Sequence, residues 1–201
     1  MPRRLPVVAI LACLWAGCGE APPAEEIAQD TVDVPDPQLT FWAALEDLCG
    51  QAFEGTVEAS VPPDEAMEGE RLVMHVRECD MAEIRIPFFV GEDRSRTWVL
   101  TTTATGLRLK HDHRHEDGSE DEVTQYGGDT DGRGTDLVQE FRADLFTAEL
   151  VPAAANNVWS IEVTPGIRFV YGLRREGSDR LFRAVFDLSR PIETPPAPWG
   201  G

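Results

Sequence analysis

Three histidines alternate with other residues near the middle of the chain, at His111, His113 and His115. Side chains two positions apart on a β-strand project from the same face, so the three imidazoles would share one face of a strand that begins near Leu107. Imidazole nitrogens combined with carboxylate oxygens are ligands that zinc, nickel, copper and iron accept. The spacing therefore predicts a metal-binding face on this strand.

A turn directly after the histidines would supply the carboxylates. The dipeptide Asp117-Gly118 is typical of a two-residue type I′ turn between antiparallel strands. In that register His115 lies opposite Glu120, and His113 lies opposite Glu122. The candidate ligands, with a transition metal as the ion, are His111, His113, His115, Glu120 and Glu122.

The same hairpin has two interpretations that involve no metal. Its register pairs His111 with Thr124, and each His/Glu pair would form a charge-assisted hydrogen bond at a solvated tip, worth about 0.2–1 kcal/mol. Alternatively, the cluster would act as a pH-responsive patch, because imidazoles titrate near neutral pH. The remaining histidine, His75, is expected to face outward with Val73 and Arg77, away from this site.

A second candidate cation site is the aspartate-rich segment 129–136. Asp129, Asp131 and Asp136 offer the oxygen ligands that calcium prefers. The spacing departs from that of an EF-hand loop, because Arg133 occupies the position of a third acidic ligand. We therefore expect a solvated, glycine-rich loop in this segment and not a calcium site.

The chain is strongly acidic, with 36 acidic and 18 basic residues among 201 and a formal net charge of −18. Such a charge repels nucleic acid and anionic lipid, so a DNA- or RNA-binding role is not expected. The sequence also contains no Gly-x-Ser-x-Gly, Ser-x-x-Lys or His-Glu-x-x-His motif, which leaves no catalytic nucleophile to single out.

The first eighteen residues resemble the export signal of a bacterial lipoprotein. Two arginines precede an apolar segment, residues 5–15, that is too short to span a bilayer. Two small residues then precede Cys18, the expected site of cleavage and lipid attachment. By resemblance to Gram-negative lipoproteins, Gly19 favours the periplasmic face of the outer membrane. Ordinary secretion is the alternative, because Trp15 stands where such motifs usually carry leucine.

Composition divides the chain into four segments. Residues 1–17 are the predicted signal peptide, and residues 18–37 form an acidic, proline-rich tether. Residues 38–190 have the length of one domain, and residues 191–201 form a proline-rich tail without expected regular structure. Loss of the signal peptide removes two arginines and no acidic residue, so the remaining chain has a formal charge of about −20.

Two cysteines, Cys49 and Cys79, lie inside the predicted domain. An even pair in an oxidising compartment favours a disulfide. It would close a loop of about thirty residues and stabilise the fold by about 3–4 kcal/mol on the chain-entropy model. The chain has no Cys-x-x-Cys spacing, so we do not expect the pair to carry out redox chemistry.

One helix and then a series of strands would position these groups. Phe41, Leu45 and Leu48 recur at helical spacing, and Gly50 ends the helix. The apolar period then changes to two residues, as in antiparallel strands with one buried face, and no further helix is expected. The alternating runs cover residues 72–77, 84–90, 97–102, 107–115, 159–163, 167–173 and 182–188.

These runs predict an all-β fold, an antiparallel meander of about ten strands after one short N-terminal helix. Closure into a barrel would remove exposed edges, and a β-sandwich is the alternative. The order of a helix followed by a meander resembles the calycin group of barrels, which includes lipocalins, fatty-acid-binding proteins and nitrobindins. The segments Gly91–Leu100 and Leu107–Gly118 resemble a family of exported bacterial proteins with no assigned activity, which supports export and assigns no catalytic residue.

Three functions are compatible with these patterns. The first is a lipid-anchored, non-catalytic barrel that binds a small molecule or a metal, which predicts an internal cavity of several hundred cubic ångströms. The second is a structural or interaction lipoprotein of the cell envelope, which predicts a packed interior. The third is a metal-dependent enzyme on a β scaffold, because His-x-His pairs on strands occur in such sites. The sequence leaves the identity of the ligand and the oligomeric state open.

Overall fold

The computed structural model describes residues 36–201, so the predicted signal peptide, Cys18 and most of the tether lie outside the described residues. The elements are α1 (Pro37–Glu46), β1 (Ala52–Val61), β2 (Leu72–His75), β3 (Glu78–Cys79), β4 (Glu83–Val90), β5 (Asp93–Thr103), β6 (Gly106–His113), β7 (Tyr126–Asp129), β8 (Val138–Ala143), α2 (Leu145–Leu150), the 3₁₀ turn η1 (Pro152–Ala154), β9 (Asn157–Thr164), β10 (Arg168–Arg175) and β11 (Leu181–Asp187).

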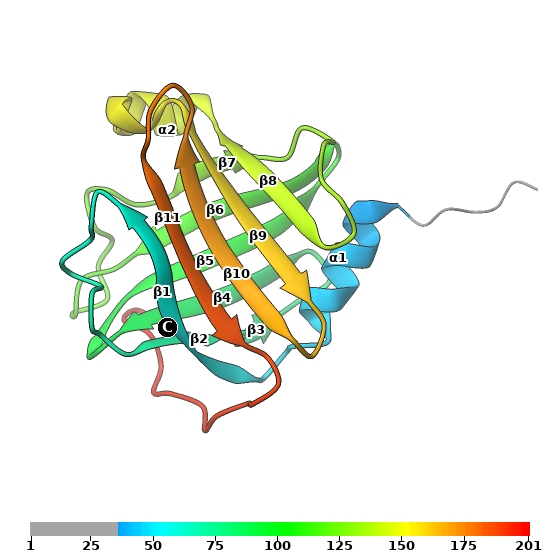
Figure 1. Cartoon of the computed structure of the whole chain (residues 1–201), viewed down its shortest axis with the longest axis vertical. Helices are drawn as coiled ribbons and strands as arrows, with labels where there is room; N and C mark the ends of the chain where they lie inside the picture. Colours follow the sequence, from blue (N-terminus) through cyan, green and yellow to red (C-terminus); the bar gives the residue numbers. More distant parts are fainter. Residues whose placement is uncertain (1–35) are drawn as a thin grey trace, which may run out of the picture. The chain divides into compact units, whose positions relative to one another are not determined.

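The strands form a closed antiparallel barrel (Figure 1). The sheet order is β2-β1-β11-β10-β9-β8-β7-β6-β5-β4-β3, and a further pairing of β2 with β4 closes ten of the strands and leaves β3 as an extra strand. The prediction of an antiparallel barrel is confirmed, and the sandwich alternative is wrong. The expectation of a single helix needs a correction, because α2 and η1 are additional helices of six and three residues. They are too short to produce a recognisable helical period.

Helix α1 contains Phe41 and Leu45 of the predicted helical repeat but ends at Glu46, so Leu48 lies in the turn that leads to Gly50. Asp36 caps its N-terminus by accepting a hydrogen bond from the Gln38 backbone N–H, and Gly50 follows its last turn with a φ of +78°. Its side chains Phe41 and Leu45 are fully buried in the core of the barrel. Figure 1 shows α1 beside the end of the barrel where β9 leads into β10. This leaves the opposite end, beside α2, for the site described below.

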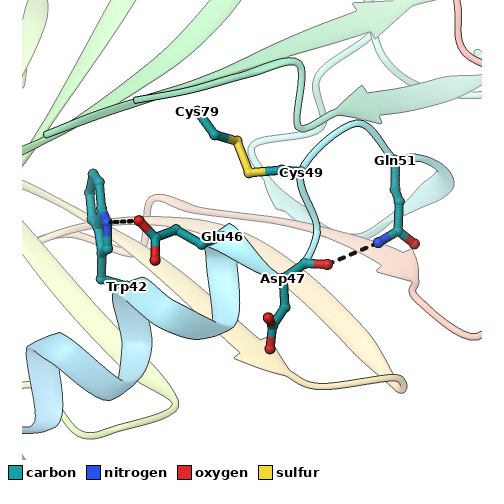
Figure 2. Close-up of a disulfide and its surroundings, with 6 residues drawn as sticks. All are labelled: Trp42, Glu46, Asp47, Cys49, Gln51 and Cys79. Atoms are coloured by element: carbon teal, nitrogen blue, oxygen red, sulfur yellow. Dashed lines mark hydrogen bonds between the residues drawn. A yellow bond between two sulfur atoms is a disulfide. The ribbon is translucent and has the colours of Figure 1, made fainter. Parts of the chain in front are cut away.

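The predicted disulfide between Cys49 and Cys79 is confirmed. It links the turn after α1 to strand β3 (Figure 2). The same turn is held by a hydrogen bond from Gln51 Nε2 to the backbone oxygen of Asp47, at 3.0 Å. The disulfide therefore fixes the chain that connects the helix to the first strand.

Replacing both cysteines by alanine is expected to lower the free energy of unfolding by about 3 kcal/mol. The disulfide closes a loop with a sequence separation of 30 residues, and its removal increases the entropy of the unfolded chain. Urea denaturation of the Cys49→Ala/Cys79→Ala variant and its parent measures the difference. Equal midpoints would contradict the expectation.

The proline-rich tail is attached to the barrel, although we expected a segment without fixed structure. It contains no helix or strand, but the Ile192 backbone N–H donates to the Ala52 oxygen on β1, and the Trp199 N–H donates to the Arg94 oxygen on β5. Since β2 and β4 lie between β1 and β5, the tail crosses the outer face of both strands. The outward-facing side chains Val73 and Phe89 are accordingly buried, with exposed fractions of 3% and 4%.

His75 shares this outer face of β2 with Val73, as the sequence indicates. It is buried and not solvated, and its Nδ1 atom has no hydrogen-bond partner among the described residues. Burial, together with the charge of Arg77, lowers the pKa of His75. The imidazole is therefore held neutral on the outside of the barrel, away from the interior.

Candidate functional site

A cavity of about 780 Å³ opens at one end of the barrel. Its lining includes Val151 and Ala154, which follow α2, and Arg175 and Leu181, which flank the β10–β11 turn. Figure 1 shows α2 and this turn at the same end of the barrel. Its walls are side chains of the eight strands β1, β4, β5, β6, β7, β9, β10 and β11, and the loops at residues 62–67, 121–123 and 151–154 contribute to its rim. The aromatic residues that line it are Phe88, Trp98, Tyr126, Trp159, Tyr171 and Phe182. The site is therefore a cavity with aromatic walls and with polar groups near its opening.

Trp98 is the centre of the aromatic wall. Its ring stacks on Phe88, with centroids 4.7 Å apart, and on Tyr171, with centroids 4.4 Å apart. Phe169 and Phe186 lie farther into the core, at 5.9 and 6.2 Å. Such pairs contribute about 0.5–1.5 kcal/mol each beyond the burial of their area. Trp98 therefore joins the packed core to the cavity wall.

His111 lies in the wall of the cavity, and both of its ring nitrogens have partners. Nδ1 is 3.1 Å from the backbone oxygen of Tyr126, and Nε2 is 2.8 Å from the hydroxyl of Tyr171. A carbonyl oxygen only accepts, so Nδ1 carries the proton and Nε2 accepts a hydrogen bond from Tyr171. Burial lowers the pKa of His111 to about 3, so the ring is neutral. Neither nitrogen is free to bind a metal.

His113 lies nearer the opening, also on the inner face. Its Nε2 is 3.2 Å from the hydroxyl of Tyr126, and its backbone N–H donates to Thr124 Oγ1 at 2.8 Å. Burial lowers the pKa of His113, and the positive charge of Arg96 on the paired strand lowers it further. The side chain is therefore a neutral hydrogen-bonding group beside the cavity.

The other three predicted metal ligands are elsewhere. His115, Glu120 and Glu122 are exposed at the hairpin tip, and Glu120 binds Arg114 at 3.1 Å. Within residues 36–201, no three His, Cys, Asp or Glu side chains gather in a way that would hold a metal ion. The structure brings His111 and His113 to the cavity but does not bring the five predicted ligands together.

The predicted register of this hairpin is wrong. On β6 and β7, His111 pairs with Tyr126 in place of Thr124. Near the tip, the His115 N–H donates to the Ser119 oxygen, and Gly118, with a φ of +85°, donates its N–H to the His115 oxygen. The turn thus has three residues, with glycine in the left-handed conformation, in place of the expected two. This shift removes the His115–Glu120 and His113–Glu122 pairs.

Arginines bind the aspartates of the candidate calcium segment. Arg108 donates to both carboxylate oxygens of Asp129, at 2.6 and 2.8 Å. Asp131 accepts hydrogen bonds from Arg133 and Arg142, while Asp136 is exposed. Guanidinium groups therefore occupy both carboxylate oxygens of Asp129 and Oδ2 of Asp131, while Oδ1 of Asp131 accepts from the Arg133 backbone N–H.

Two arginines at the opening are functional candidates that the sequence reading missed. Arg175 and Arg180 line the cavity, and Arg175 Nε donates to Asn157 Oδ1 at 2.8 Å. The guanidinium of Arg180 forms no hydrogen bond with a described residue, and its Nε is buried without a partner. The sequence feature that could have indicated them is their position: Arg175 and Arg180 flank a Gly-Ser turn that lies between two alternating runs.

No family model matches the chain, and the comparisons with curated proteins and with solved structures give no match either. The resemblance to a family of exported bacterial proteins therefore stays a prediction. Among residues 36–201, no helix is both long enough and apolar enough to cross a membrane.

Proposed function

We propose that this protein is a non-catalytic binding module that holds a small organic molecule inside the open end of its barrel. The observation that carries the proposal is the cavity of about 780 Å³ with its aromatic wall. Pockets for small ligands are usually about 300–1,000 Å³, mostly apolar, with a few polar groups that orient the ligand. A structural or interaction protein with a filled core would not leave this space.

The polar groups of the wall suit recognition and not acid–base chemistry. His111 is neutral with both nitrogens occupied, and burial raises the pKa of Tyr126 to about 12. Burial raises the pKa of Tyr171 as well. A general acid or base works best when its pKa lies near the working pH, which is not true of these groups. They supply hydrogen bonds of fixed direction to a ligand.

The proposal places this module at the cell envelope, attached to the outer membrane through a lipid on Cys18. The export signal and the acidic tether of residues 18–37 support this location. The Cys49–Cys79 disulfide is compatible with it, because disulfides persist in oxidising compartments. In this arrangement the tether would hold the barrel away from the lipid surface, with the cavity open to the solvent.

Filling the cavity is expected to weaken the binding of an uncharged aromatic probe, N-phenyl-1-naphthylamine. Leu173 faces the cavity and is half-buried, so Leu173→Trp adds a large ring to the space that the probe would occupy. We expect saturable probe fluorescence with the parent and an affinity at least about tenfold lower with the variant.

The matched control is Ile167→Trp, which adds the same ring in the β9–β10 turn, where Ile167 is 62% exposed. This variant should bind the probe as the parent does. Equal binding by both tryptophan variants would show that the probe lies outside the cavity, and no binding by the parent would contradict the proposed function.

A further inference from the structure

Arg175 and Arg180 face each other across the β10–β11 hairpin. Arg174 pairs with Leu181 in the ladder, and the Arg175 N–H donates to the Arg180 oxygen at 3.1 Å, which continues the ladder by one residue. Directly opposite residues of an antiparallel pair project from the same face. Both side chains line the cavity, so this is the inner face.

The two guanidinium groups have no carboxylate partner among the described residues. Asp64, Glu65 and Asp121 also line the cavity, but no carboxylate oxygen of residues 36–201 lies within 4.0 Å of either arginine. The adjacent Arg174, on the outer face, binds Glu140 at 2.9 Å and Glu176 at 3.4 Å. In a chain with twice as many acidic as basic residues, Arg175 and Arg180 are thus left unpaired, whereas Arg96, which also lines the cavity, binds Asp93 at 2.5 Å.

This arrangement has an energetic cost in the empty protein. Like charges directly opposite on a β-hairpin repel each other and destabilise it. Arg180 makes no hydrogen bond through its guanidinium, and Arg175 makes one, to the neutral amide of Asn157. An anion between the two groups would relieve the repulsion and accept the unused donors. Guanidinium groups bind carboxylate, sulfonate and phosphate oxygens in this way.

We propose that the ligand is an amphipathic organic anion, whose acidic group lies between Arg175 and Arg180 and whose ring-bearing or apolar body lies against Trp98 and Trp159. This inference rests on the proposed function and adds the chemical class of the ligand. The chain is acidic overall, and Asp64, Glu65 and Asp121 also line the cavity, so the arginine pair, which no carboxylate contacts, is the favourable place for the anionic group. Carboxylate, sulfonate and phosphate ligands of this class have one feature in common, a negative group joined to an apolar body.

The test compares two probes that differ by one acidic group. 8-Anilinonaphthalene-1-sulfonate carries a sulfonate, and N-phenyl-1-naphthylamine has the same rings without it. With Arg175→Gln/Arg180→Gln, we expect the affinity for the sulfonate to fall about tenfold or more, because charge-assisted hydrogen bonds are lost. The affinity for the uncharged probe should be unchanged.

Arg190→Gln is the matched control, because Arg190 is exposed outside the cavity and also lacks a carboxylate within 4.0 Å among the described residues. It should change neither affinity. Equal sulfonate binding by the double variant and its parent would overturn the anionic class, while retained binding of the uncharged probe would leave the proposed function intact. Failure of the parent to bind either probe would overturn both proposals.

Discussion

Lowering the pH from 6.5 to 4.5 is expected to reduce the free energy of unfolding by about 2 kcal/mol more in the parent than in a His111→Gln variant. The pKa of His111 is lowered from 6.5 to about 3, chiefly by burial. Between these two values the unfolded chain binds a proton that the folded protein does not. The contribution of His111 to the free energy of unfolding is therefore fully present above pH 6.5, and it is lost progressively as the pH falls toward 3.

Urea denaturation of both proteins at the two pH values measures this difference. His75 and His113 also have lowered pKa values and contribute to the acid sensitivity of both proteins. Because they are present in the parent and in the variant, the difference between the two slopes reports His111 alone. Parallel slopes would mean that His111 accepts a proton in the folded state, and then Tyr171 would not be its hydrogen-bond donor.

The barrel was predictable from the sequence because its inner face is apolar along most strands. Ile84, Ile86 and Phe88 alternate on β4, and all three are buried in the core. Trp159 and Ile161 on β9 follow the same rule. A period of two residues assigns a face to each side chain before any partner strand is known. Closure then follows from the number of strands, since an open sheet of this size would leave exposed edges.

The histidine hairpin shows what the period of two residues does not determine. Asp117-Gly118 suits a two-residue turn, but it also suits a three-residue turn with Gly118 in the left-handed conformation, as observed. A second irregularity at Gln125, with a φ of +58°, shifts the pairing again before Tyr126. Register depends on such single residues, and a shift of one position changes every cross-strand pair. The predicted His/Glu pairs depended on one choice of turn.

The cavity and the tail depend on contacts between distant parts of the chain. Whether Trp159 fills the interior or lines a space is decided by the loops over the opening, which carry no apolar period. The sequence does indicate that the outer face of β4, which the tail covers, is buried. Phe88 and Phe89 make both faces of β4 apolar, and an apolar outer face requires a cover. The sequence does not indicate which segment provides that cover.

Trp98→Ala is expected to lower the free energy of unfolding by about 4 kcal/mol. Trp98 is 2% exposed and contacts rings from three other strands, so its removal loses both apolar burial and ring stacking. The space it leaves joins the existing cavity, and neighbouring side chains cannot collapse across it. Urea denaturation measures the loss, and a loss below about 1 kcal/mol would contradict a core position.

Trp98→Phe separates the structural role of this residue from its role in binding. Phenylalanine keeps a ring on the inner face of β5. The loss in free energy of unfolding for Trp98→Phe should therefore be less than half of the loss for Trp98→Ala. N-Phenyl-1-naphthylamine should bind Trp98→Phe more tightly than Trp98→Ala, because the probe needs a flat apolar surface in the wall. If both variants bind the probe as the parent does, the ligand lies nearer the opening, and the arginine pair and Phe182 become the surface to test.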